Sequence, residues 1–87
     1  MSESFIIPEN ITFEFIDSNV YILDIDNGEY YKLSKSASII WKEIEKGFNI
    51  DNIKTRLKDL FDYDKNIDND VDEIIKNLKT LKLIKDN

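Results

Sequence analysis

The hydrophobic period of this sequence changes once, at Ser34, from the period of strands to that of helices. Across residues 12–33, apolar and polar residues alternate with a period of two, which is typical of half-buried strands. From residue 34 onward, apolar residues recur at steps of three and four, which is the period of amphipathic helices. A chain of 87 residues has room for one hydrophobic core. The pattern therefore predicts a single small α+β domain, with its strands first and its helices second.

Three strands are predicted in the first half of the chain, at residues 12–17, 20–25 and 29–33. Turn-forming residues separate them, and Asn27-Gly28 is a strong hairpin signal because both residues tolerate positive φ. An apolar face is expected on each strand, formed by Phe13 and Phe15, then by Tyr21, Leu23 and Ile25, then by Tyr31 and Leu33. Tyr30 and Lys32 fall on the other face of the third strand. The three strands should form an antiparallel meander.

Three helices are predicted in the second half, each with an apolar stripe. The stripes contain Ala37, Ile40, Trp41 and Ile44, then Ile50, Ile53, Leu57, Leu60 and Phe61, then Ile67, Val71, Ile74, Leu78 and Leu81. The predicted caps are Ser34 or Ser36, then Asn49, then Asp64 or Asn66, with Gly47 ending the first helix. Trp41 lies on the first stripe and is interpreted as a core residue. Leu83-Ile84 is expected to pack back on the core.

The composition excludes several kinds of chemistry. The chain contains no Cys and no His, which rules out disulfides, thiolate metal sites and imidazole bases. Nothing in the sequence places a nucleophile beside a base, so we expect no enzymatic activity, no cofactor and no metal. The net charge of −6 opposes nucleic-acid binding, which depends on clustered Lys and Arg. The sequence favours a protein that acts through its surface and shape.

The acid-rich segment at residues 62–73 shares part of its pattern with a calcium-binding EF-hand loop. Oxygen-bearing residues occupy the ligand positions, namely Asp62, Asp64, Asn66, Asp68, Asp70 and Glu73. The sixth position requires Gly for a sharp turn, and this chain has Ile67 there. Ile67 and Val71 also fit the apolar stripe of the third helix. The preferred interpretation is a helix start whose acids interact favourably with the helix dipole.

The third strand is an edge of the predicted meander, so its outer N–H and C=O groups are unpaired. If the third helix flanks this edge, the two form a groove to which an extended peptide adds as a further strand. The outward ring of Tyr30 is interpreted as an isolated surface aromatic, as part of a small cluster with Ile22, or as part of that binding surface.

The segment Val20–Ser34, with the sequence VYILDIDNGEYYKLS, and the triplet Ile39-Ile40-Trp41 resemble the PqqD-like family of peptide chaperones. The resemblance continues through Asp70-Val71, Leu78, Leu81 and Leu83-Ile84, so that it covers roughly residues 11–84. Members of this family serve pathways of ribosomally synthesised and modified peptides (RiPPs), and their domain is called the RiPP recognition element. The family commonly has Asn at the position of Ser34 and Gly at that of Lys82. Because Lys tolerates positive φ poorly, the sequence does not predict the exact residue at which the third helix ends.

The resemblance implies a winged-helix-like domain of three strands followed by three helices. It implies that the leader of a precursor peptide docks as an added strand against the third strand, beside the third helix. The binding positions carried over to this chain are Glu29, Tyr30, Tyr31, Lys32, Leu33, Val71, Ile74, Ile75 and Leu78. Ile75 lies about 60° from the centre of the apolar stripe, so it is expected to border the groove.

The resemblance also implies a function, which is to hold the precursor's leader and present it to a modifying enzyme. That partner would be a lasso-peptide protease and cyclase pair or a radical-SAM enzyme. The alternative is a winged-helix regulator, or a module that contacts a folded protein. An open edge strand could in addition pair two copies into a homodimer.

Residues 1–10, which include Pro8, are expected to form an irregular arm before a domain at residues 11–85. The arm lacks the basic start and long apolar run of a signal peptide. No stretch approaches the ~20 apolar residues that a membrane span needs. The expected location is therefore the cytosol, with no membrane partner.

Overall fold

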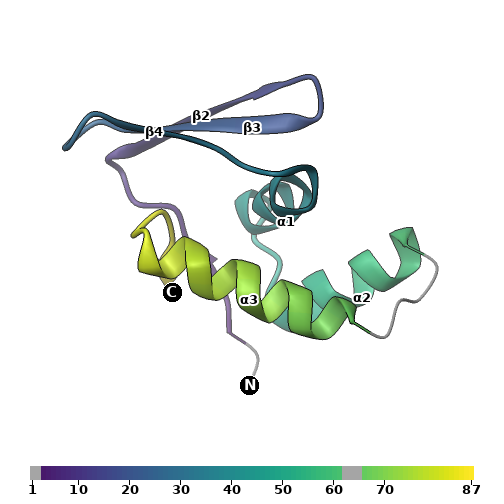
Figure 1. Cartoon of the computed structure of the whole chain (residues 1–87). Coiled ribbons are helices and arrows are strands. Elements are labelled where there is room, and N and C mark those ends of the chain that lie inside the picture. The colour runs from purple at the N-terminus through teal and green to yellow at the C-terminus, as the bar shows by residue number, and fades with distance from the viewer. Residues whose placement is uncertain (1–2, 62–65) are drawn as a thin grey trace.

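A three-stranded antiparallel sheet lies above three helices in the computed structural model, which describes residues 3–61 and 66–87 (Figure 1). The sheet is formed by β2 (Ile11–Ile16), β3 (Asn19–Asp24) and β4 (Glu29–Lys32). The helices are α1 (Lys35–Glu45), α2 (Ile50–Leu60) and α3 (Ile67–Thr80). A separate two-stranded sheet is formed by β1 (Phe5–Ile6) and β5 (Lys85–Asp86). The predicted α+β order, a meander followed by three helices, is confirmed.

The register of the meander decides which side chains face the helices. Phe13 lies opposite Ile22 and Ile22 lies opposite Tyr31, so these three residues share one face of the sheet. Phe13 packs edge-on against the buried Trp41 of α1, with 5.4 Å between the ring centroids, so this face is the inner one. Leu23 and Tyr30 lie opposite each other on the outer face.

The apolar face predicted for the middle strand, with Tyr21, Leu23 and Ile25, is wrong. Val20 and Ile22 are the fully buried residues of β3, whereas Ile25 is 57% exposed. Both faces of this strand carry large apolar side chains, so the two-residue period alone does not select the inner face. The neighbouring strand selects it, because directly opposite residues must point to the same side.

The helix boundaries follow the predicted caps. The N–H of Ala37 donates to Ser34 Oγ at 3.2 Å, and the N–H of Asn52 donates to Asn49 Oδ1 at 2.9 Å. Gly47 follows α1 with a φ of 93°, which suits glycine at this position. Asn66 occupies the position before α3, but its side chain makes no capping hydrogen bond there. Asp64, the other predicted cap, lies outside the described residues.

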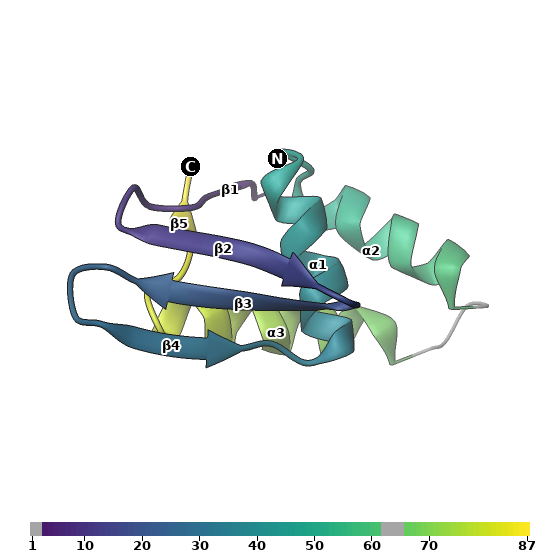
Figure 2. The ribbon, with the colours of Figure 1, turned by 90° about the horizontal axis from the view of Figure 1, so that it is seen from above.

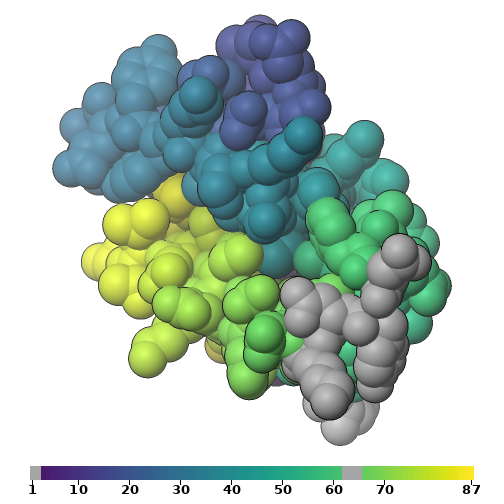
Figure 3. Space-filling model, turned by 45° about the vertical axis from the view of Figure 1, so that its right-hand side comes forward, coloured from purple at the N-terminus to yellow at the C-terminus, as the bar shows by residue number. Residues whose placement is uncertain are grey.

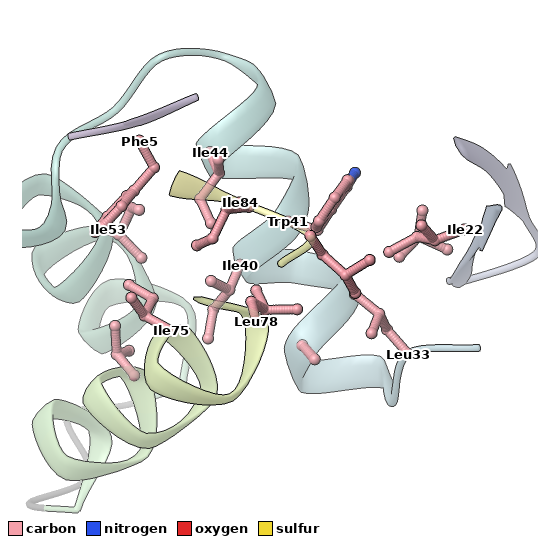
Figure 4. Close-up of a cluster of buried hydrophobic side chains, with 14 of the residues drawn as sticks. Phe5, Ile22, Leu33, Ile40, Trp41, Ile44, Ile53, Ile75, Leu78 and Ile84 are labelled. Atoms are coloured by element: carbon pink, nitrogen blue, oxygen red, sulfur yellow. The ribbon is translucent and has the colours of Figure 1, made fainter. Parts of the chain in front are cut away.

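One core joins the sheet, the helices and both ends of the described chain (Figure 4). Trp41 is fully buried, which confirms its interpretation as a core residue. Leu83 and Ile84 are also buried, so the predicted packing of the C-terminal pair is confirmed. Three residues assigned to helix stripes are instead exposed, namely Leu60, Phe61 and Leu81. Leu60 and Phe61 stand at the end of α2, which extends past the sheet (Figure 2).

The N-terminal segment forms a strand that the sequence did not predict. Phe5 and Ile6 pair antiparallel with Asp86 and Lys85, and the side chain of Phe5 is buried in the core. Each of these strands has only two residues, which is too short for a visible period. Among the described residues, no helix is long and apolar enough to cross a membrane.

The end of α3 adopts a backbone conformation that favours glycine. Lys82 has a φ of 60°, in the left-handed region. The N–H of Leu83 donates to the C=O of Leu78 at 3.0 Å, and the N–H of Lys82 donates to the C=O of Lys79 at 2.9 Å. These two bonds form a Schellman motif, which usually has Gly at the left-handed position. The third helix therefore ends in the turn that usually contains Gly, although this chain has Lys82 at that position.

Candidate functional site

The outer edge of β4 is the first part of the candidate site. The order of strands in the sheet is β2-β3-β4, so β4 has a neighbour on one side only. The N–H of Leu33 donates to the C=O of Val20 at 3.0 Å, which identifies one hydrogen-bonded pair. Since such pairs alternate along an antiparallel ladder, Glu29 and Tyr31 also direct their main chain toward β3. Tyr30 and Lys32 therefore direct their N–H and C=O groups to the open edge.

The side chains of β4 divide between the two faces of the sheet as predicted. Tyr30 points outward and is 74% exposed. Lys32 also points outward, and its ammonium lies 5.7 Å from the ring centroid of Tyr21. Tyr31 packs against the core and donates its hydroxyl proton to Glu29 at 2.8 Å. This hydrogen bond raises the pKa of Tyr31 above its usual value of 10.0. Leu33 is buried just beyond the strand.

One flank of α3 is occupied by contacts within the protein, and we call it the closed flank. Its acids bind two lysines of α2, with Lys54 Nζ 2.8 Å from Asp72 and Lys58 Nζ 3.0 Å from Asp68. On the same flank, Lys79 binds Glu3 and Asp86 from the two ends of the chain, at 3.0 and 2.7 Å. Figure 2 shows α2 on the side of α3 that is farther from β4.

The opposite flank of α3 contains Asp70, Ile74 and Leu81, and we call it the open flank. At about 100° per residue, these three positions lie across the helix from Asp68 and Asp72. Ile74 is half-buried, and Leu81 is 43% exposed. Figure 3 shows the sheet above, α3 below and the start of α1 between them. Ser36, at the start of α1, borders the same hollow as Asp70 and Ile74. The open flank and the β4 edge thus belong to the same side of the molecule.

This hollow of about 170 Å³ lies between α1, the end of α2 and the N-terminal part of α3, where it borders Asp70 and Ile74 of the open flank. Its apolar wall is formed by Ile40, Leu57, Phe61, Ile67, Val71 and Ile74. Ser36 and Asp70 supply its polar groups. Ser36 stands only four residues after Lys32, so the hollow begins where β4 passes into α1. We refer to it as the α3 hollow.

The predicted position of Ile75 at the border of the groove beside β4 is wrong, because Ile75 borders a hollow on the closed flank instead. Ile75 is 3% exposed and points to the side of Ile53 and Phe5 (Figure 4). The unpredicted strand β1 places Phe5 there, so the apolar stripe of α3 is wider on the closed flank than the sequence indicated. Val71 and Leu78 are equally buried and hold α3 to the core. Ile74 is the predicted helix residue that reaches the open side.

The acid-rich segment provides no described metal site. Asp62 and Asp64 lie outside the described residues, and Asp68, Asp70 and Glu73 lie within α3. Among residues 3–61 and 66–87, no group of three or more acids is arranged to hold a metal ion. The second half of the calcium-loop pattern is therefore helical, which does not match an EF-hand loop.

Two solved structures share this fold. TbiB1 in complex with the TbiA(beta) leader peptide is 22% identical, with a TM-score of 0.85 over 91% of this chain and 93% of that chain. A lasso peptide synthetase B1, complexed with the leader peptide, is 19% identical, with a TM-score of 0.77 over 94% of this chain and 98% of that chain. A comparison with curated proteins finds no match.

A family model gives the stronger relationship. The model for coenzyme PQQ synthesis protein D (PqqD) matches residues 19–84. The match starts at the first residue of β3 and ends with the buried pair Leu83-Ile84, so it includes both β4 and α3. The chain belongs to the PqqD family.

Proposed function

We propose that this protein binds the leader segment of a ribosomally made precursor peptide by adding it as a strand to β4. The observation that carries the proposal is the open edge of β4 on the same side of the molecule as the α3 hollow. Strand addition needs such an edge for its main-chain hydrogen bonds and nearby pockets for its side chains. Two proteins of this fold were solved as complexes with leader peptides, which supports the same use here.

The two parts of the site have different tasks in this proposal. Tyr30 and Lys32 pair with the main chain of the peptide, while Glu29, Tyr31 and Leu33 hold β4 in place. Ile74 contacts the peptide's inward side chains, and Val71 and Leu78 hold α3 in position from the core. Ile75 is not included, because it faces the closed flank. Sub-micromolar affinity corresponds to about −8 kcal/mol, which requires a few anchoring side chains besides the main-chain bonds.

The protein in this proposal carries out no bond chemistry itself. It holds the precursor for a maturation enzyme, either a protease and cyclase pair or a radical-SAM enzyme, in the cytosol. The predicted homodimer would form at β2, the other edge of the sheet, which leaves β4 free for the peptide. Light scattering with and without peptide measures whether such a dimer exists and whether the peptide leaves it intact.

The experiment that tests leader binding is a titration of isotope-labelled protein with synthetic leader peptides of precursors encoded near its gene. Amide shifts should concentrate at residues 29–33 and 70–81. The variant Lys32→Pro should weaken binding by about tenfold, because it removes an N–H that faces the open edge. It leaves the bonds between β3 and β4 intact, so the protein should remain folded.

The matched control is Lys32→Thr, which removes the same charge but keeps the edge N–H and suits a strand. This variant should bind nearly as well as the wild type. Equal binding by the Pro and Thr variants would contradict strand addition at β4. Amide shifts confined to the outer face of the sheet would mean that the peptide binds that face and not the groove between β4 and α3.

A further inference from the structure

We propose that the α3 hollow receives a basic side chain, Arg or Lys, of the bound peptide, with its charged head on Asp70. This inference rests on the proposed function, and it names the chemistry that the site selects. The hollow combines an apolar wall with one carboxylate, and Asp70 contributes that carboxylate. A side chain with an apolar stem and a cationic head matches both parts.

The acids of α3 differ in whether they already have a cation. Asp68 and Asp72 bind Lys58 and Lys54 on the closed flank. Asp70 makes no ion pair with any residue of the described chain. Its charge is therefore available to a ligand. The net charge of −6 attracts a cationic peptide toward the same surface.

A purely apolar side chain fits the hollow less well. By filling the hollow it would cover the Asp70 carboxylate and remove water from it without supplying a hydrogen bond, which is costly for a charged group. An Arg or Lys head instead forms a charge-assisted hydrogen bond with that carboxylate. Ser36 offers a second oxygen at the same hollow. The lining therefore favours a basic side chain over an aliphatic one.

The position of the hollow is compatible with a peptide paired to β4. Because Ser36 follows Lys32 by four residues, a peptide that pairs with β4 and continues past its end passes the start of α1. Alternate residues of an extended peptide point to the same side, so one of them can face the hollow while its neighbours face solvent. A single basic position is expected, rather than a generally basic peptide.

The test starts from a displayed library of random peptides of about ten residues, the upper range of strand length, selected against the full chain. The selected peptides are made synthetically, together with versions in which the basic residue is replaced by citrulline for Arg or norleucine for Lys. Binding is measured to the wild type, to Asp70→Asn and to Asp72→Asn. The Asp72 variant is the matched control, because it removes the same charge from the same helix on the closed flank.

The expected result is one enriched basic position, with amide shifts at β4 and at Asp70. Neutralising that peptide residue should lower affinity about tenfold for the wild type and for Asp72→Asn, but little for Asp70→Asn. Peptides that shift β4 without any basic preference, or that bind Asp70→Asn equally well, would overturn the inference and leave leader binding standing. If no selected peptide shifts β4, the proposed function fails as well.

Discussion

The two flanks of α3 carry similar residues but differ in their surroundings. On the closed flank, acids and lysines form ion pairs with α2, β5 and the N-terminal segment, and Ile75 is buried beneath them. On the open flank, Asp70 has no cation among the described residues and Ile74 is only half-buried. The adjacent isoleucines Ile74 and Ile75 therefore have different tasks. We expect the closed flank to hold the fold together and the open flank to take part in the proposed peptide binding.

The largest expected effect on stability comes from replacing Ile74 and Ile75 by alanine, one at a time. Ile75→Ala should lower the free energy of unfolding by about 3 kcal/mol, because it leaves a cavity beside Ile53 and Phe5. Ile74→Ala removes a side chain that is half-exposed, so it should cost about 1 kcal/mol. Urea unfolding measures both values. Peptide binding should follow the opposite order, with Ile74→Ala the more damaging change.

Two results would remove the distinction between the flanks. One is an equal loss of stability in both alanine variants. The other is normal peptide binding by a folded Ile74→Ala protein. A smaller substitution, Ile75→Val, provides a check, because it should cost about 1 kcal/mol and leave binding unchanged.

An intermediate effect on stability is expected at Lys82, just after the C-terminal end of α3. Lys82 has a φ of 60°, which costs a residue with a side chain about 1 kcal/mol relative to glycine. Lys82→Gly should therefore raise the free energy of unfolding by about 1 kcal/mol, measured by urea or heat. Lys82→Ala separates the backbone from the charge, since it removes the ammonium and keeps the strain. A stabilising Lys82→Ala of the same size would show that charge, not φ, is responsible.

The smallest expected effect is a loss of stability at alkaline pH through the closed flank. Hydrogen bonds to Asp72 and Asp86 raise the pKa values of Lys54 and Lys79 above 10.5. A raised lysine pKa gives stability that is present below pH 10.5 and is lost as the pH rises through the folded-state pKa. These pairs are partly exposed, so each should contribute about 0.5 kcal/mol.

Unfolding of Lys54→Met, Lys79→Met and the control Lys76→Met across this pH range measures that contribution. The first two variants should show a flatter loss of stability than the wild type, and Lys76→Met should not. Tyr31 contributes in the same direction, since its pKa is also raised, and the variant Tyr31→Phe separates its contribution from that of the lysines. Unchanged pH profiles in all three lysine variants would mean that the closed flank is held by apolar packing alone.

The local patterns of this sequence were sufficient to predict the three-stranded meander and the three helices in their correct order. The change of period at Ser34, the Asn27-Gly28 turn and the caps at Ser34 and Asn49 each act within a few residues of themselves. For the same reason the outward direction of Tyr30 could be predicted, because it depends only on strand alternation.

The errors at β3, at Ile75 and at the two terminal strands involve partners that are distant in the sequence. The inner face of β3 depends on the register with β2, and Ile75 is buried in the same cluster as Phe5, about seventy positions earlier. The strands β1 and β5 are too short to carry a period of their own. The sequence identifies Asp70 only as one of several acids at a helix start, and the ion pairs of Asp68 and Asp72 with α2 distinguish it from its neighbours. Sequence order does not contain these distances.

The register of β4 has a consequence for how this protein can change. The residues that offer their main chain to the open edge, Tyr30 and Lys32, are the same ones whose side chains leave the sheet on its outer face. If a peptide adds to β4 as proposed, its main-chain hydrogen bonds should therefore survive most substitutions at these two positions, proline excepted. In the proposed binding mode their side chains contact only the peptide residues that also face outward, so substitutions at Tyr30 and Lys32 would change the preference for those residues and leave the inner pockets unchanged. The main-chain pairing of a peptide and its side-chain preference at the outer face could therefore change separately.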